Sequence, residues 1–94
     1  MNKTDYLLKY VSCDCYNKIL KYSNDYIISG LMYSRIDVDL NIRYLIDIGI
    51  KNLDAVIYDR LEDLIKSHNE FSLMIDGYIN SLGKNKFISM LENL

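Results

Sequence analysis

The sequence predicts an all-α fold, a compact bundle of five or six helices. The 94-residue chain contains no proline and only four glycines, so nothing is expected to break a helix from within. Apolar residues recur every three or four positions in several segments, which is typical of one buried helix face. Connections of a few residues separate these segments, and short connections make consecutive helices pack together. Because half of the residues are hydrophobic, we expect residues 1–94 to form one domain with its own core.

The first third of the chain predicts a helix with a bend or break. Thr4 is a suitable N-cap, and the helix would carry its apolar residues at Leu7, Leu8 and Val11 and then at Cys15, Ile19 and Leu20. Ser23, Asn24 and Asp25 offer three capping residues in a row. They predict a kink or break, after which a helix resumes and ends near Ser34.

The middle of the chain predicts a short helix that Asp37 or Asp39 caps and Gly49 ends. Its apolar residues are Leu40, Ile42, Leu45 and Ile46. The β-branched residues of this stretch would also suit a strand. The chain offers no hairpin signal and no second strand, so a helix is the better interpretation.

Residues 52–94 have the clearest helical pattern. Residues 52–66 predict one amphipathic helix, and residues 67–82 predict a second helix. Ser67 and Glu70 form the S-x-x-E pattern of a capping box, and Gly83 stands where a helix commonly ends. A last helix follows from Lys84 to Leu94.

The residues that could carry chemistry are few. Cys13 and Cys15 would point about 200° apart on a helix, which disfavours a disulfide between them. A structural zinc site needs four ligands, and the single His68 is the only other good candidate. We therefore expect reduced thiols, no catalytic residues, no metal and no cofactor.

Composition and charge disfavour nucleic acid and membrane as partners. The net charge is −2, and the lysines and arginines of the first third of the chain are spread out rather than gathered on one face. No run approaches the ~20 apolar residues of a membrane span, and the first residues lack the apolar region of a secretory signal. These features predict a cytoplasmic protein that binds another protein.

The acidic side chains are concentrated in the middle of the chain. Residues 37–63 contain seven acidic and three basic residues, whereas residues 1–36 contain three acidic and five basic ones. On the predicted helix 52–66 the acidic residues lie off the apolar stripe. The simplest interpretation is an ordinary solvated face, and the functional one is a surface that steers a basic partner.

The order of these elements resembles the caspase-recruitment domain (CARD) branch of the death-fold superfamily. The matching residues run from about Ile19 to Leu94. They comprise the break near Ser23-Asn24, the segment VDLNIRYLIDIG, the acidic segment IYDRLED, the longer EFSLMIDGYINSL, and the ending in which Gly83 precedes Phe87. The chain departs from the family in two ways. Residues 1–16 exceed what such a first helix needs, and the sequence reaches Leu94 before a sixth helix.

The resemblance implies a Greek-key bundle with a kinked first helix and two charged binding surfaces. Its acidic surface would comprise Asp47, Asp54, Asp59, Glu62 and Asp63, and its basic surface Lys18, Lys21, Arg35 and Lys66. The implied partner is a CARD-containing host protein. A stand-alone domain of this kind, encoded by a virus, would modulate apoptotic or innate-immune signalling by inhibiting its partner.

Two other functions remain open from the sequence. The chain has nine tyrosines, more than a small bundle easily buries, and an exposed aromatic patch would suit a small oligomeric helical protein. The acidic middle segment would also suit a phage or bacterial inhibitor that covers the basic surface of a nucleic-acid-binding enzyme. Such an inhibitor would bind with a strong dependence on salt.

Overall fold

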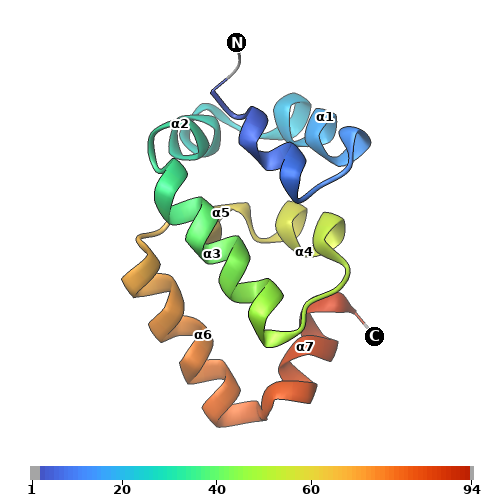
Figure 1. Cartoon of the computed structure of the whole chain (residues 1–94), viewed down its shortest axis with the longest axis vertical. Coiled ribbons are helices and arrows are strands. Elements are labelled where there is room, and N and C mark those ends of the chain that lie inside the picture. The colour runs from blue at the N-terminus through green and yellow to red at the C-terminus, as the bar shows by residue number, and fades with distance from the viewer. Residues whose placement is uncertain (1–2, 94) are drawn as a thin grey trace.

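The computed structural model describes residues 3–93, and its regular structure in this range is entirely helical (Figure 1). A 3₁₀ helix, η1 (Asp5–Lys9), precedes the α-helices. These are α1 (Cys13–Tyr22), α2 (Asp25–Tyr33), α3 (Arg35–Ile48), α4 (Leu53–Asp59), α5 (Leu61–Leu64), α6 (His68–Leu82) and α7 (Lys84–Glu92). The radius of gyration is 12.9 Å, which is typical of a compact chain of this length. The predicted compact all-α fold is confirmed for these residues, but they form seven α-helices and one 3₁₀ helix rather than the five or six helices predicted.

The helices gather around α3. Figure 1 shows η1, α1 and α2 at one end of the molecule and α6 and α7 at the other, with α3 running between them. Helix α3 packs against α2, α5 and α6, while α7 packs against α6 and α4. Helix α4 also packs against α1, so α4 and α5 lie between the two ends.

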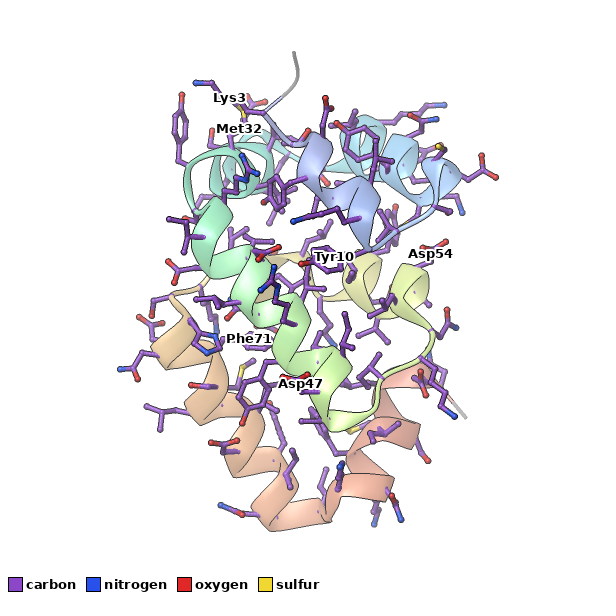
Figure 2. The ribbon with its side chains drawn as sticks, viewed as in Figure 1. Lys3, Tyr10, Met32, Asp47, Asp54 and Phe71 are labelled. Atoms are coloured by element: carbon purple, nitrogen blue, oxygen red, sulfur yellow. The ribbon has the colours of Figure 1, made fainter. Side chains whose placement is uncertain are left out.

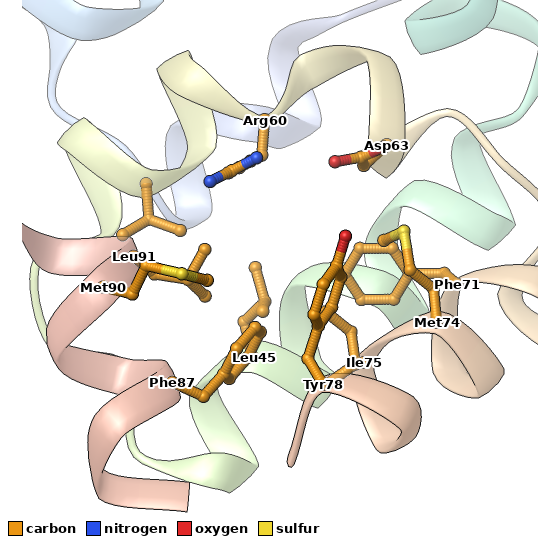
Figure 3. A pocket seen from close by; sticks show the side chains of 11 residues that line it. Leu45, Arg60, Asp63, Phe71, Met74, Ile75, Tyr78, Phe87, Met90 and Leu91 are labelled. Atoms are coloured by element: carbon orange, nitrogen blue, oxygen red, sulfur yellow. The ribbon is translucent and has the colours of Figure 1, made fainter. Parts of the chain in front are cut away.

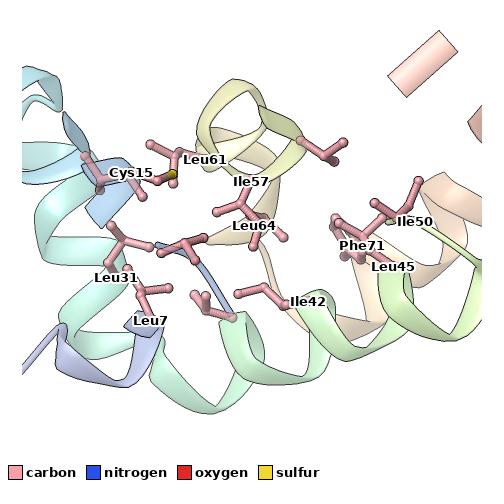
Figure 4. Close-up of a cluster of buried hydrophobic side chains, with 14 of the residues drawn as sticks. Leu7, Cys15, Leu31, Ile42, Leu45, Ile50, Ile57, Leu61, Leu64 and Phe71 are labelled. Carbon is pink, nitrogen blue, oxygen red and sulfur yellow. The ribbon is translucent and has the colours of Figure 1, made fainter. Parts of the chain in front are cut away.

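One apolar core joins all of these helices (Figure 4). Every helical segment contributes at least one side chain that is almost fully buried: Leu7, Ile19, Leu31, Ile42, Ile57, Leu64, Phe71 and Phe87. Burying a side chain of this size contributes about 1.5–3 kcal/mol relative to leaving it in water. The core therefore explains why short helices, which would be marginal in isolation, are stable here.

The predicted first helix starting at Thr4 is wrong, because the structure divides this segment. Residues 5–9 form η1, and α1 begins only at Cys13. Ser12 caps α1, since its Oγ accepts a hydrogen bond from the Cys15 N–H at 3.2 Å. The Ser12 N–H and Oγ–H in turn donate to the Asp54 carboxylate at 2.9 and 2.6 Å. A contact with α4 thus holds the break in place.

The bend predicted near Ser23 is a complete break between α1 and α2. Ser23 has an extended backbone (φ −79°, ψ 145°). The Asn24 side chain caps α2 by accepting a hydrogen bond from the Ile27 N–H at 2.9 Å. Of the three residues that predicted the break, Asn24 therefore caps α2 with its side chain, while Asp25 is the first residue of that helix.

The start predicted for the helix before Gly49 is wrong. Helix α3 begins at Arg35 and extends over 14 residues. Asp37 instead accepts a hydrogen bond from the backbone N–H of His68 at 3.0 Å, at the start of α6. Asp39 pairs with Lys9 and Arg43 at 3.3 and 3.1 Å. The end at Gly49 is confirmed, and its φ of 111° suits glycine.

The segment 52–66 is not one helix, because the chain breaks at Arg60 into α4 and α5. Arg60 has φ −117° and ψ 26°. No glycine or proline in the sequence marks this break. Tertiary hydrogen bonds hold the segment on both sides of it, through Asp54 at the start and through the carbonyls of Leu64 and Lys66 at the end. The break lies between these two attachments.

The predicted ends of the helix 67–82 are confirmed. The Ser67 Oγ accepts a hydrogen bond from the Glu70 N–H at 3.3 Å, and Gly83 follows the last helical residue with φ 85°. Helix α7 then returns toward α4. There the Glu92 carboxylate accepts hydrogen bonds from the N–H groups of Lys51 and Asn52, at 2.7 and 2.6 Å, and so holds the turn before α4.

Candidate functional site

A polar groove separates α4 and α5 from the junction of α1 and α2. One wall consists of residues around the helix break, namely Tyr22, Ser23, Asn24 and Ile27. The other wall is formed by Tyr58, Asp59, Arg60, Leu61, Glu62 and Asp63. Tyr22 is 65% exposed, so an aromatic ring faces solvent beside several carboxylates. We call this feature the acidic groove.

Two carboxylates of the acidic groove are free to bind a partner. Asp59 and Glu62 are exposed, and neither forms an ion pair with any residue of the described range 3–93. Asp63 is half-buried, and the Lys66 Nζ lies 3.4 Å from its carboxylate. The negative potential of the groove therefore depends mainly on Asp59 and Glu62.

Asp54 and Asp47, the other residues predicted for an acidic binding surface, lie elsewhere. Asp54 is half-buried and holds Ser12, as described above. Asp47 is exposed on α3 and does not line the groove (Figure 2). The structure thus brings together only the last three of the five predicted acidic residues, Asp59, Glu62 and Asp63.

The residues predicted for a basic surface are placed separately. Lys18 lies in a hollow that Asp54 also lines. The ammonium group of Lys21 lies 5.3 Å from the centre of the Tyr22 ring, and the Arg35 guanidinium 5.2 Å from that of Tyr6. Lys66 pairs with Asp63 of the acidic groove but does not itself line the groove.

The two cysteines lie in different environments. Cys13 is exposed, while the Cys15 thiol is buried and donates a hydrogen bond to the Asp54 carbonyl at 3.4 Å. Burial, and then the nearby Asp54 charge, raises the pKa of the Cys15 thiol. Among residues 3–93 no group of three His, Cys, Asp or Glu side chains could hold a metal ion.

A buried amide, which the sequence did not indicate, joins α3 to the end of α5 and the start of α6. The Asn41 Nδ2 donates to the carbonyls of Leu64 and Lys66, at 2.9 and 3.0 Å. The Asn41 Oδ1 lies 2.9 Å from His68 Nδ1. Since both amide hydrogens go to carbonyls, the oxygen must accept, and His68 Nδ1 carries the proton. His68 is half-buried, and this hydrogen bond fixes its side chain against α3.

On the other side of α4 and α5 lies an apolar hollow of about 270 Å³ (Figure 3). Helices α3, α4, α6 and α7 supply its apolar lining of Leu45, Val56, Phe71, Met74, Ile75, Tyr78, Phe87, Met90 and Leu91. Arg60 and Asp63 complete the lining, and both also line the acidic groove. The Tyr78 ring stacks on that of Phe87, with centroids 5.6 Å apart.

The sequence predicted neither the hollow nor the first wall of the groove. Residues such as Leu45 and Phe87 lie on apolar stripes, so in the sequence they look like fully packed core. Tyr22 and Asn24 are far from Asp59 in the sequence. Only the packing of α1 and α2 beside α4 places them across the groove.

Within residues 3–93, no helix has both the length and the apolar composition needed to cross a membrane. Comparison of the chain with protein-family models, with curated proteins and with solved structures finds no match.

Proposed function

We propose that this chain is a non-enzymatic protein-interaction module whose acidic groove binds a basic surface of a partner protein. The observation that carries the proposal is the pair Asp59 and Glu62, two exposed carboxylates without an ion pair in the described chain. Tyr22 and Tyr58 flank them. Tyrosine rings give contact area at low entropic cost, and the carboxylates select lysine or arginine.

We further propose that the partner is a CARD-containing signalling protein of a host cell. The support is the sequence resemblance, which assigns the acidic surface to Asp47 on α3 and to the segment that forms α4 and α5. In this proposal the chain acts in the cytoplasm, occupies the basic surface of its partner and thereby inhibits apoptotic or innate-immune signalling. The death-fold topology belongs to the same proposal, in which α1 and α2, separated by the break at Ser23, correspond to the two halves of the kinked first helix.

The test is binding of the purified chain to a panel of host CARDs by surface plasmon resonance at several salt concentrations. We expect the double variant Asp59→Lys with Glu62→Lys to abolish binding, because it replaces both attractive charges by repulsive ones. We expect wild-type binding to weaken as salt rises, since exposed charges are screened within about 10 Å at 0.1 M salt.

The single variant Glu62→Lys has a matched control in Asp47→Lys, which makes the same change of charge at an exposed position outside the groove. We expect it to weaken binding at most a few-fold. Equal losses in Glu62→Lys and Asp47→Lys would show that net charge alone drives binding. Undiminished binding of the double variant would rule out the groove.

A second candidate function is self-association through the end of the molecule formed by α2 and the start of α3. There Tyr26, Tyr33 and Ile36 are 72, 76 and 79% exposed. Large apolar groups exposed in this way suit an interface between subunits. Sedimentation at micromolar concentration distinguishes the two functions, because a dimer insensitive to salt favours self-association and a monomer favours the acidic groove.

A further inference from the structure

The apolar hollow has the properties of a small-molecule site. Its floor consists of side chains that are at most 7% exposed, including Leu45, Val56, Phe87 and Leu91. The space of about 270 Å³ corresponds to about nine water-sized groups of ~30 Å³ each. Water in such a space finds few polar partners, whereas an apolar group gains dispersion contacts with the walls. An apolar body of eight to ten carbon atoms, roughly this volume, is therefore the preferred occupant.

The mouth of the hollow carries hydrogen-bond donors that the described chain does not use. The Arg60 guanidinium has no ion-pair partner within residues 3–93, and the Tyr78 hydroxyl has no hydrogen-bond partner there. Figure 3 shows the polar ends of Arg60, Tyr78 and Asp63 around the opening. Lys66 offsets the charge of Asp63 at 3.4 Å, which leaves the guanidinium as the uncompensated charge.

We propose that the hollow binds a small amphipathic carboxylate. The apolar body lies among Leu45, Val56 and Phe87, and the carboxylate accepts hydrogen bonds from Arg60. A planar guanidinium matches a carboxylate with two parallel hydrogen bonds, and Tyr78 provides a further donor. Asp59 and Glu62 do not oppose this binding directly, because they line the acidic groove and not the hollow.

The positive charge of Arg60 at the mouth should make the hollow prefer a carboxylate to other ligands of the same size. A cationic amphiphile would meet Arg60, and Asp63, the acidic residue of the lining, is already paired with Lys66. A neutral alcohol would fill the hollow but would leave the guanidinium without an anionic partner. We therefore expect decanoate to bind more tightly than decanol, although both carry ten carbon atoms.

The experiment is titration of the full chain with decanoate and with decanol, followed by calorimetry and by NMR shifts of the leucine methyl groups. We expect decanoate to bind with a Kd on the order of 0.1 mM and decanol about tenfold more weakly. The shifts are expected at Leu45 and Leu91. In Arg60→Gln, decanoate should bind about tenfold more weakly, while decanol binding should not change.

Two control variants keep the result interpretable. Asp63→Asn alters the same rim without removing the cation, so it should leave decanoate binding unchanged or tighten it. Met90→Trp enlarges a side chain of the rim that is 44% exposed, so the core is not disturbed, and it should weaken both ligands. Circular-dichroism melting verifies that each variant is folded.

Several results would overturn the assignment. If neither compound binds, or if the shifts lie outside the hollow, the hollow is not a ligand site. Equal affinities for decanoate and decanol, or an Arg60→Gln variant that binds decanoate as wild type does, would reject the carboxylate. This experiment uses no protein partner, so its failure leaves the proposed role of the acidic groove unaffected.

Discussion

Helices α4 and α5 are held in different ways on their two sides. Toward α2 and α3 the contacts are close and the polar groups are paired. Asn41 bonds to the carbonyls of Leu64 and Lys66, and Gly30 approaches Ile65 so closely that an added Cβ would lie 2.8 Å from its Cδ1 atom. Toward α6 and α7 the same helices border the apolar hollow of about 270 Å³.

This difference separates the part of the molecule that fixes the fold from the part that can accept a ligand. Paired buried amides specify one arrangement, because any other arrangement would leave them unsatisfied. An incompletely filled apolar hollow has no buried polar groups that must be paired, so it tolerates added volume. We therefore expect mutations on the two sides to have opposite consequences for stability.

The largest effect is expected at Asn41. The variant Asn41→Ala would leave the Leu64 and Lys66 carbonyls and the His68 Nδ1–H without their partner. We expect a loss of about 3 kcal/mol in the free energy of unfolding, measured with urea, because buried unpaired polar groups cost ~1–3 kcal/mol each and water relieves part of this cost.

The control for this prediction is Asn80→Ala, at an exposed position of α6. It should change the free energy of unfolding by less than about 0.5 kcal/mol. If both variants have the same small effect, Asn41 does not hold α3 to α5.

An intermediate change in stability is expected from two substitutions of glycine by alanine. Gly30→Ala places a Cβ within 2.8–2.9 Å of three Ile65 side-chain atoms, whereas a Cβ at Gly77 meets nothing within 4 Å. Crowding costs ~1–3 kcal/mol, and replacing glycine by alanine in a helix gains about 1 kcal/mol. We expect Gly30→Ala to destabilise and Gly77→Ala to stabilise, with a difference of about 2 kcal/mol in thermal or urea unfolding. A stabilising Gly30→Ala would show that Ile65 moves away easily.

The smallest change in stability is expected from adding one methylene group beside the hollow. Val56→Ile adds one methylene beside the hollow, and Val38→Ile adds the same group to a fully buried side chain that does not line it. A buried methylene gains about 0.8 kcal/mol where space exists and costs about 1 kcal/mol where it does not. We expect Val56→Ile to stabilise slightly and Val38→Ile to destabilise. Equal destabilisation in differential scanning calorimetry would mean that the hollow is not available to an added group.

Some elements were predictable because their signals are local. Asn24 caps α2, Ser67 caps α6, and Gly49 ends α3, and in each case the interacting atoms lie within a few residues of one another. Asp37 looks like a helix cap in the sequence, and Asp54 looks like part of an acidic face. Each binds a residue more than 30 positions away, so a local pattern could not indicate its partner.

The candidate sites were harder to predict from the sequence than the helix ends, because they depend on how the helices pack. The sequence placed Asp59, Glu62 and Asp63 on the outer face of a helix, and the structure keeps them in one groove. The hollow could not be predicted, because periodicity tells which side chains face inward and not whether they fill the space between helices.

The helical nature of this protein and the ends of most of its helices can be predicted from local sequence signals. Those properties follow from apolar spacing and caps, which act over one or two turns. The tertiary structure separates η1 from α1 and α4 from α5. It also decided that Arg60 and Asp63 stand between an acidic groove and an apolar hollow. Such features depend on contacts between residues distant in the chain, and these contacts override local preference because burying and pairing groups contributes more than helix propensity.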